Sequence, residues 1–466
     1  MSRSRVLAVS LITTFLPTGS FAEENSTPPR LSAWTVLVYG AVDNDWERPF
    51  MSDVRAMRRG LSGVDDVEVV LLVDRSPEYS SDARALGDDF ADSRLYRLTG
   101  GAAERLDGTP ELPLTKTSAV ELDLGDAATL GAFVKYGKAH YPARHYALFL
   151  VSHGEGMRFC PDETNDDAEI FTAELTEHLT EAESVDLLGF DACLMAGVEN
   201  AYEWRRRPGR FGADILLAAA PVSSSWPYQE IFARIGEKDD LAPGAFASIV
   251  IDELDDQIRE GRSGDEGIER DLQAWGAFDL SKVEEAKQRL DALAACLFLE
   301  EEKADLIALR GKGLEADTFV YVWPERDADV NMPFVDLCHL CERIAESDAF
   351  SDPARALAAD AAEAAAAIVT RSVGFDHYDG FAPGRHGLYL VFPDGDQTTR
   401  RGATYWERTE WYSPLRVRTD DGAYGRYAWC ADGSIPGNGE VETWFELMDA
   451  WFDAPGAEGG GNGYAW

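Results

Sequence analysis

Apolar runs alternate with amphipathic segments through the first half of the chain. The apolar runs predict buried strands over 34–39, 67–73, 146–151, 185–190 and 215–219. Helical periodicity predicts helices between them, over about 126–139 and 172–182. Strands that are apolar on both faces are typical of parallel sheets covered by helices. The pattern therefore predicts an α/β fold with a mostly parallel sheet flanked by helices.

The second half of the chain is richer in helices. Helices are predicted over about 246–258 and from Asp352 to about 370. Another is predicted to begin at Ser281, because Ser281 and Glu284 have capping-box spacing. Short strands are predicted over 275–278 and 387–392. We expect a core over 34–250, a part over 251–400 that completes or flanks the sheet, and an aromatic, Gly-rich tail over 401–466.

The first residues have the pattern of an export signal. Arg3 and Arg5 precede an apolar stretch over 6–16, and Ser20-Phe21-Ala22 fits a small-x-small cleavage site. The stretch is too short to span a membrane, and no later run reaches 18 uninterrupted apolar residues. We expect a signal peptide over 1–22, a linker over 23–33 and an exported protein, periplasmic or extracellular.

Acidic residues greatly outnumber basic ones. The 466 residues include 84 Asp and Glu against 43 Lys and Arg, which gives a formal net charge of −41. Nucleic-acid binding rests on basic side chains that neutralise phosphates, so this composition argues against a nucleic-acid enzyme. An acidic surface instead attracts basic partners.

The cysteines are too few for a disulfide scaffold in a chain of this length, and sequence alone cannot pair them. Cys338 and Cys341 form a C-x-x-C pattern on the apolar face of a predicted helix, without a second pair of metal ligands. We expect both to be buried in a helix. A disulfide or redox role and a zinc site are the alternatives.

Two reactive side chains follow consecutive strands of the predicted sheet. His153 comes after the run 146–151, and Cys193 comes after the run 185–190. Ligands bind beyond the carboxyl ends of the strands in such sheets. A thiol attacks only as thiolate and needs a neighbouring base, which His153 would supply if the two strands are adjacent.

Two further features would support a nucleophilic Cys193. We expect a helix to begin near Leu194, so that its N-terminus favours the thiolate. Gly154 lets its backbone N–H approach a substrate carbonyl, and together with the N–H of Cys193 it would form an oxyanion hole.

The chain resembles the clostripain family of cysteine peptidases. The resemblance rests, in chain order, on Trp34-Thr-Val-Leu-Val-Tyr39 with Asp43-Asn44-Asp45, Leu124-Gly-Asp126, Tyr141-Pro142, Ser152-His153-Gly154-Glu155-Gly156, Leu188-Gly-Phe-Asp-Ala-Cys-Leu-Met195, Trp226-Pro227-Tyr228 and His386-Gly387-Leu388 with Phe392-Pro393. It implies a caspase-like fold, with His153 as general base and acid and Cys193 as nucleophile. The family works with a dyad, and we identify no third member.

The resemblance also bears on specificity. Members of the family generally prefer Arg or Lys before the scissile bond, because an acid lines the pocket that receives this side chain. Asp191 matches the family motif and is the candidate for that acid. A carboxylate there would bind a guanidinium through charge-assisted hydrogen bonds. The alternative is that Asp191 caps the following helix. The chain has no acid between Asp214 and Glu230, where many relatives carry one, which weakens the expectation.

Self-cleavage between the histidine and the cysteine activates several members of the family from a zymogen. Arg158 is the one Lys or Arg in residues 154–192 and is the candidate cleavage site; the alternative is an ordinary loop arginine. Asp162, Glu163, Asp166 and Asp167 lie in the same segment. We expect a solvated acidic loop, no required cofactor and no metal ligands, with calcium binding left open because some relatives require it.

The sequence and the resemblance thus predict an exported cysteine endopeptidase that acts on protein or peptide substrates, and the resemblance implies a preference for basic ones. Two alternatives remain. One is a catalytically silent homologue that serves as a secreted binding module, against which the retention of His153 and Cys193 argues. The other is a thiol–disulfide exchange protein that uses Cys338 and Cys341. The oligomeric state stays open.

Overall fold

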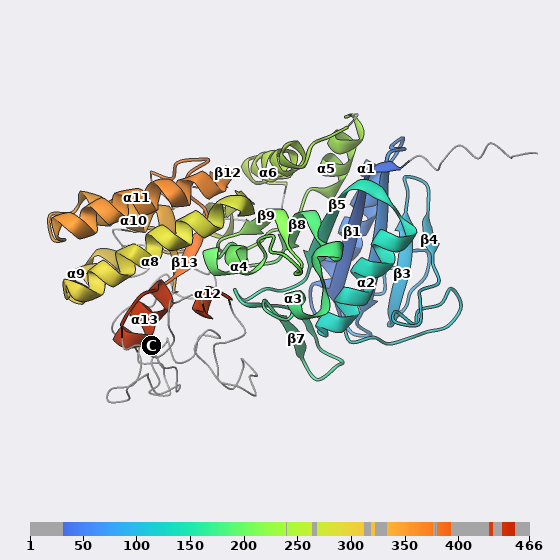
Figure 1. Ribbon diagram of the computed structural model, residues 1–466. Helices are drawn as coiled ribbons and strands as arrows, with labels where there is room; N and C mark the ends of the chain where they lie inside the picture. Colours follow the sequence, from blue (N-terminus) through green and yellow to red (C-terminus); the bar gives the residue numbers. More distant parts are fainter. Residues whose placement is uncertain are drawn as a thin grey trace, which may run out of the picture. The chain divides into compact units, whose positions relative to one another are not determined.

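A mostly parallel nine-stranded sheet lies at the centre of the computed structural model, which describes residues 31–238, 240–262, 268–311, 318–321, 333–375, 378, 380–392, 428–431 and 440–452 (Figure 1). Its strand order is β12-β10-β9-β8-β5-β1-β2-β3-β4. The parallel strands are β1 (Ser32–Val42), β2 (Val67–Arg75), β5 (Ala143–Val151), β8 (Val185–Asp191) and β9 (Ala213–Ala219). Antiparallel strands flank them: β3 (Ser93–Leu98), β4 (Ala103–Arg105), β10 (Ala274–Asp279) and β12 (Val369–Gly374).

Helices cover both faces of the sheet, because successive side chains of each buried strand point to opposite sides. Val36 and Val38 share a core with α1 (Glu47–Gly60), α5 (Tyr228–Gly236) and α6 (Pro243–Arg259). Leu37 and Tyr39 share the other core with α2 (Ala127–His140), α4 (Val198–Glu203), α8 (Val283–Leu299), α10 (Leu337–Glu346) and α11 (Asp352–Ile368). The predicted fold class is confirmed.

The second half of the chain extends the same sheet. β10 pairs with β9 and β12 pairs with β10, so both strands belong to the sheet that the first half begins. The remaining elements are β6 (Arg158–Asp162) with β7 (Ala168–Phe171), β11 (Phe334–Asp336) with β13 (Tyr389–Val391), α3 (Leu175–His178), α7 (Ile268–Asp271), α9 (Lys303–Arg310), α12 (Ala428–Ala431), α13 (Trp444–Phe452) and the 3₁₀ turns Glu181–Glu183 and Leu280–Lys282.

Tyr389 connects the second half to the segment after Cys193. Its backbone N–H donates to Ala196 O at 2.9 Å, and its hydroxyl donates to Leu194 O at 2.5 Å. The side chain lies directly over Gly197, where a Cβ would come within 2.8 Å of the ring. The C-terminal half therefore supports the loop that carries the candidate nucleophile.

Two local predictions were wrong. The helix expected over 172–182 is reduced to α3 and a 3₁₀ turn, because Thr180 and Glu183 form a capping box that starts a new turn. The capping box expected at Ser281 and Glu284 is replaced by Asp279, whose side chain accepts the N–H of Ser281.

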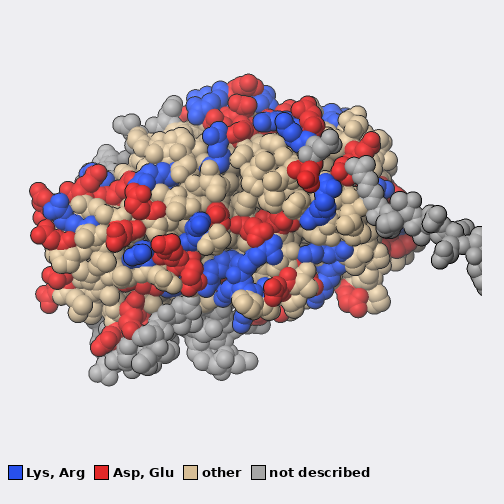
Figure 2. Space-filling model, turned by 45° about the horizontal axis from the view of Figure 1, so that its top comes forward, with Lys and Arg blue, Asp and Glu red and all other residues tan. Residues whose placement is uncertain are grey.

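Several N- and C-terminal predictions fall outside the described residues. These are the signal peptide, nearly all of the linker and most of the tail. Among the helices that the structure describes, none combines the length and apolar character needed to cross a bilayer. Acidic residues do not form a uniform coat, because Lys and Arg lie among Asp and Glu on the face shown in Figure 2.

Candidate active site

His153 and Cys193 follow neighbouring strands in register. β5 and β8 are parallel and adjacent, and Val151 pairs with Asp191. Ser152 N–H continues the pairing by donating to Asp191 O at 3.3 Å. Each candidate lies two residues beyond the Val151–Asp191 pair, and adjacent strands are separated by about 4.8 Å. The structure thus brings the imidazole-bearing and thiol-bearing segments to the same edge of the sheet.

Gly154 lies against the backbone of the cysteine loop. A Cβ at this position would come within 2.5 Å of Cys193 O and 2.8 Å of the Met195 sulfur, so no larger residue fits without a shift. Among the described residues, nothing accepts a hydrogen bond from the Gly154 N–H. This N–H is therefore available to a substrate oxygen near Cys193.

The surroundings of Cys193 differ from those expected. No helix begins near Leu194: the residue has a left-handed φ of 62°, and α4 begins at Val198. The backbone N–H of Leu194 donates to Pro221 O at 2.8 Å, which fixes the turn after Cys193. The partly exposed Cys193 Sγ instead accepts the backbone N–H of Ser223 at 3.2 Å. A backbone N–H from the loop after β9 takes the place of the predicted helix terminus in stabilising negative charge on sulfur.

The sequence did not single out Asp45 as a residue of the site. Its Oδ1 lies 2.6 Å from Nε2 of His153. A carboxylate only accepts, so Nε2 carries the hydrogen and Nδ1 has the lone pair that can take a proton. The available signal was the position of Asp45 after β1, since β1 neighbours β5 and both strands end at the same edge.

Asn44 holds the turn that carries Asp45. Its side-chain N–H₂ donates to Ala41 O at 3.2 Å, to Ser152 Oγ at 3.3 Å and to Pro161 O at 3.0 Å. Its side-chain oxygen accepts the N–H of Trp46 at 3.0 Å. The buried amide therefore links the turn after β1 to the residue before His153.

Asp191 is fully buried beneath the loop after β9. Its oxygens accept hydrogen bonds from Ser223 Oγ at 3.2 Å, Trp226 N–H at 3.3 Å and Tyr228 hydroxyl at 3.0 Å. Burial raises the pKa of Asp191 to about 7. The carboxylate caps no helix after β8, contrary to the alternative considered for it, and in this conformation the loop covers it.

A second acid lies near Asp191, although the sequence offered none in the expected segment. Asp53 in α1 is 8% exposed, and its Oδ2 has no hydrogen-bond partner in the described part of the chain. Burial raises its pKa well above the usual range, and the negative charge of Asp191 adds to the effect. The sequence predicted no helix over α1, and nothing in it indicated that Asp53 reaches the site.

Arg158 lies in a strand rather than in an open loop. It begins β6, its guanidinium pairs with Glu169 at 2.6 Å and with Glu155, and its O accepts the N–H of Glu155 at 2.9 Å. The neighbouring Cys160 N–H donates to His153 O at 3.1 Å. The peptide bond after Arg158 therefore lies within backbone hydrogen bonding between β6 and the segment that carries His153, the candidate base.

All six cysteines lie in the described part of the chain; Cys193 and Cys296 are partly exposed, and the others, Cys160, Cys338, Cys341 and Cys430, are buried. Cys338 and Cys341 are buried on α10, as expected, and burial raises the pKa of both thiols. Thiol–disulfide exchange requires an accessible thiolate, so their position argues against it.

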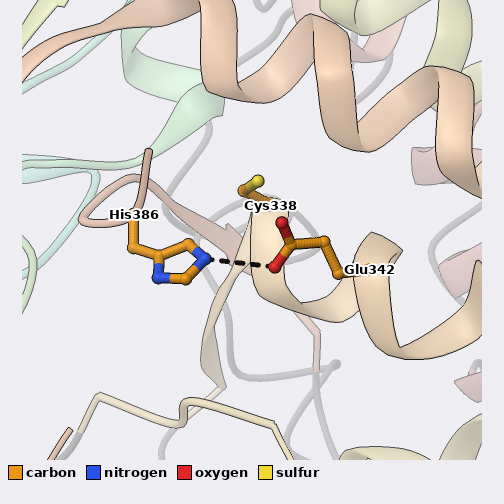
Figure 3. Close-up of side chains that lie close together, drawn as sticks. All are labelled: Cys338, Glu342 and His386. Carbon is orange, nitrogen blue, oxygen red and sulfur yellow. Dashed lines mark hydrogen bonds and ion pairs between the residues drawn. The ribbon is translucent and has the colours of Figure 1, made fainter. Parts of the chain in front are cut away.

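Cys338, Glu342 and His386 are close enough together to hold a metal, but their polar atoms have partners (Figure 3). His386 Nδ1 accepts the N–H of Ala382 at 3.0 Å, which leaves Nε2 to donate to Glu342 at 3.2 Å. Glu342 also pairs with Arg385, and its hydrogen bonds lower its pKa to about 2. These contacts account for the cluster as a structural network.

The acidic segment after β6 divides into two parts. Glu163, Asp166 and Asp167 are exposed, as expected for a solvated loop, whereas Asp162 is buried. Asp162 lies near a second group of acids, Asp43, Asp74 and Glu121, whose oxygens lie close enough together to hold a metal.

Comparisons with known sequences identify the family of this chain. A sequence model described as the clostripain family matches residues 38–451. Clostripain of Hathewaya histolytica is 35% identical over 471 aligned positions, which cover 93% of this chain and 89% of that protein.

Solved structures support the fold. An inactive zymogen C11 protease from Parabacteroides distasonis superposes with a TM-score of 0.56 at 17% identity, over 82% of this chain and 98% of that one. A secreted C11 cysteine protease from Bacteroides thetaiotaomicron, in complex with an irreversible peptide inhibitor, gives a TM-score of 0.55 at 17% identity with the same coverage.

Proposed function

The chain belongs to the clostripain family of cysteine endopeptidases, and we propose that Cys193 is its nucleophile and His153 its general base and acid. The observation that carries this proposal is the register of β5 and β8, because it sets the two segments side by side at the edge where ligands bind. The Asp45 contact supports the role of the imidazole, since it leaves Nδ1 free to accept the thiol proton.

The reaction is acyl transfer. Nδ1 of His153 takes the thiol proton, the Cys193 sulfur attacks the scissile carbonyl carbon, and the carbonyl oxygen becomes an oxyanion. The N–H groups of Gly154 and Cys193 donate to this oxyanion. The C–N bond then breaks, and the imidazolium gives its proton to the leaving amine.

Hydrolysis of the thioester completes the cycle. His153 takes a proton from a water molecule, whose oxygen attacks the acyl carbon. The carbon–sulfur bond breaks, the acid product leaves, and Cys193 returns as the thiol after reprotonation. These steps use only side chains and backbone groups of the chain, and we propose that no cofactor takes part in the bond-breaking steps.

We further propose that Asp191 recognises Arg or Lys before the scissile bond. A basic side chain would reach the carboxylate only after the Ser223–Trp226 loop shifts, and its charge would replace the hydrogen bonds that the loop now supplies. The second acid, Asp53, adds negative potential to the same region.

We also propose that residues 1–22 are a signal peptide that directs export, and that the protein cleaves itself after Arg158. This cleavage requires β6 to open.

Labelling of the active thiol tests the proposal. An Arg-derived acyloxymethyl ketone is expected to modify Cys193, and the modification should be lost in Cys193→Ala and His153→Ala. Cys296→Ser, which removes another partly exposed thiol, serves as the matched control and should label like the wild type. A Leu-derived reagent tests whether the pocket at Asp191 selects a basic side chain. An unlabelled Cys193 in folded protein would instead favour a silent binding module.

A further inference from the structure

Two buried acids from distant elements lie near each other, and we propose that Asp53 is a second recognition acid, which contacts the guanidinium of an arginine side chain together with Asp191. Asp53 lies in α1, and Asp191 ends β8. The negative charge of Asp191 acts on Asp53. This inference rests on the proposed function, because it adds a second acid to the basic pocket of that proposal.

The packing of α1 explains why Asp53 reaches this region. At the end of α1, Gly60 fits closely against α5, since a Cβ there would lie 2.5 Å from Gln229 O. Helix α5 begins at Tyr228, whose hydroxyl donates to Asp191 at 3.0 Å. Burial raises the pKa of Tyr228, and the negative charges of Asp191 and Asp53 add to the effect. Both acids therefore lie near the same hydroxyl.

Asp53 has an oxygen without a partner. The residue is 8% exposed, and its Oδ2 is inaccessible to solvent and accepts no hydrogen bond from the described residues. Burial raises the pKa of Asp53, and a hydrogen bond from Ser225 in the loop after β9 offsets only part of the effect. A buried carboxylate with an unused acceptor is destabilising unless a proton or a donor from a ligand satisfies it. One acceptor beside Asp191 is thus available to a ligand.

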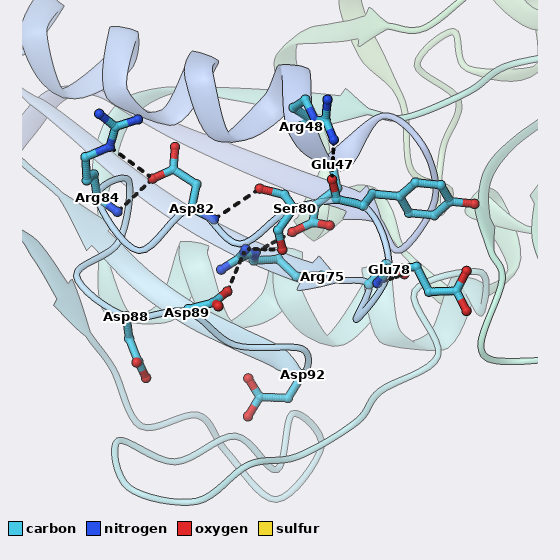
Figure 4. A network of polar contacts seen from close by, with 12 residues as sticks. Glu47, Arg48, Arg75, Glu78, Ser80, Asp82, Arg84, Asp88, Asp89 and Asp92 are labelled. Carbon is cyan, nitrogen blue, oxygen red and sulfur yellow. Dashed lines mark hydrogen bonds and ion pairs between the residues drawn. The ribbon is translucent and has the colours of Figure 1, made fainter.

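No basic side chain of the described residues forms an ion pair with Asp53 or Asp191. Arg55, two positions along α1, pairs with Asp82. Asp82 also accepts the backbone N–H of Arg84 at 2.7 Å and lies 3.8 Å from the Arg84 guanidinium (Figure 4). The two buried acids are therefore not neutralised from within this part of the chain, which favours a cationic ligand.

The loop that covers Asp191 is itself incompletely hydrogen-bonded. Ser224 Oγ and Trp226 Nε1 are buried and have no hydrogen-bond partner among the described residues. Gln257 of α6 donates to Ser225 O at 2.6 Å and holds the middle of the loop. Moving the loop would break no hydrogen bond of the Ser224 and Trp226 side chains, which reduces the cost of exposing Asp191 to a substrate.

The chemistry of two neighbouring carboxylates fits a guanidinium. This group presents five N–H donors in one plane, so it can donate to two carboxylates at once. Its positive charge would favour the ionised form of both acids and offset the repulsion between them. The segment between Asp214 and Glu230 holds no acid, so the second carboxylate comes from α1.

Paired labelling rates test the role of Asp53. We expect an Arg-derived acyloxymethyl ketone to label Cys193 faster than a citrulline-derived one, because citrulline has the shape of arginine without its charge. In Asp53→Asn, the ratio of the two rates at pH 8.5 should fall by roughly 10- to 100-fold, as expected for the loss of a hydrogen bond between charged groups. A general disturbance of Cys193 would instead lower both rates and leave their ratio unchanged.

Asp65→Asn is the matched control. Asp65 is exposed and follows the end of α1, so this variant has the net charge of Asp53→Asn but keeps the buried acid. Its ratio of labelling rates should equal that of the wild type. An unchanged ratio in Asp53→Asn, or an equal fall in both variants, would overturn the inference and leave the proposed function standing.

Benzamidine, an amidinium that needs no reactive thiol, gives a second readout. In calorimetric titration of the full-length protein at pH 8.5, Asp53→Asn should bind it at least about tenfold more weakly than the wild type and Asp65→Asn. Equal affinity in the wild type and Asp53→Asn, or no binding to either at about 10 mM, would overturn the inference. Weaker binding in Asp53→Asn, with Cys193 unlabelled in the wild type, would support the recognition acid and contradict the proposed nucleophile.

Thermal unfolding distinguishes recognition from a structural role. Asp53→Asn removes an unpaired buried acid and keeps the shape of the side chain, so its thermal midpoint at pH 8.5 should equal or exceed that of the wild type. A lower midpoint with an unchanged ratio of labelling rates would show that Asp53 serves the fold alone.

Discussion

Nε2 of His153 lies 2.6 Å from Oδ1 of Asp45, so a carboxylate from the end of β1 orients the imidazole at the end of β5. Asp45 is largely exposed, which distinguishes it from the buried aspartate of a serine-protease triad. Water can therefore replace part of the hydrogen bonding between Asp45 and His153. Asp45 is therefore a positioning residue whose effect on rate should be intermediate.

Replacing Asp45 by Asn tests this relationship. The amide of Asn can donate to Nε2 and thereby favour the tautomer in which Nδ1 carries the proton, which cannot act as a base. We expect a roughly 10- to 100-fold fall in the rate of Cys193 labelling, smaller than the loss from His153→Ala. The pH profile of labelling should shift with Asp45→Asn, a change that a purely structural role would not produce. Asp167→Asn, an exposed acid outside the contact, should leave both rate and profile unchanged.

Gly154→Ala tests the close approach of the histidine and cysteine loops. The new Cβ would lie 2.5 Å from Cys193 O, so one loop must move and the Gly154 N–H must leave its position. We expect labelling of Cys193 to fall by about 100-fold, in line with the loss of an oxyanion donor, and stability to fall by about 1–3 kcal/mol. Gly101→Ala is the control, because a Cβ there meets nothing within 4 Å. Equal behaviour of the two variants in labelling and thermal unfolding would contradict the argument.

The sequence predicted the central strands because their apolar runs are long and uninterrupted. β1, β2, β5, β8 and β9 each include the run from which they were predicted. It also predicted that His153 and Cys193 share an edge, since both follow consecutive strands of one sheet. The antiparallel pair β3 and β4 and the β6–β7 hairpin were missed, because their short strands carry no strong alternation.

The details of the site depend on contacts between distant segments. The helix expected at Leu194 fails because Pro221 and Ser223 hold the residues after β8 in a turn, and no local pattern reports those partners. Asp45 and Asp53 were missed for the same reason, since each reaches the site from an element more than 100 residues away. The sequence motif around Asp191 gave no indication that the loop after β9 covers this carboxylate.

Basic specificity should depend on pH through Asp191. Burial raises its pKa to about 7, so the carboxyl is largely neutral at pH 5.5 and ionised at pH 8.5. Only the ionised form attracts a guanidinium, so the preference for an Arg over a citrulline reagent should grow as pH rises through about 7. Asp191→Asn should abolish this pH-dependent preference, and Asp214→Asn, which changes a partly exposed acid paired with Arg206 outside the site, should retain it. A pH-independent ratio of the two labelling rates in the wild type would rule out Asp191 as the recognition acid.

Stability should also depend on pH through Asp74 and Glu121 of the acidic cluster. The pKa of Asp74 is raised in the native state and that of Glu121 reaches about 7, both above their values in the unfolded chain. The native state therefore holds more protons than the unfolded state between about pH 4 and 7, so this contribution to stability is present at low pH and is lost as pH rises through about 7. The thermal midpoint of the wild type should fall between pH 5.5 and 8 more than that of Glu121→Gln, which lacks one of the titrating groups. Wild type and variant with the same pH dependence would show that the repulsion among these carboxylates does not limit stability.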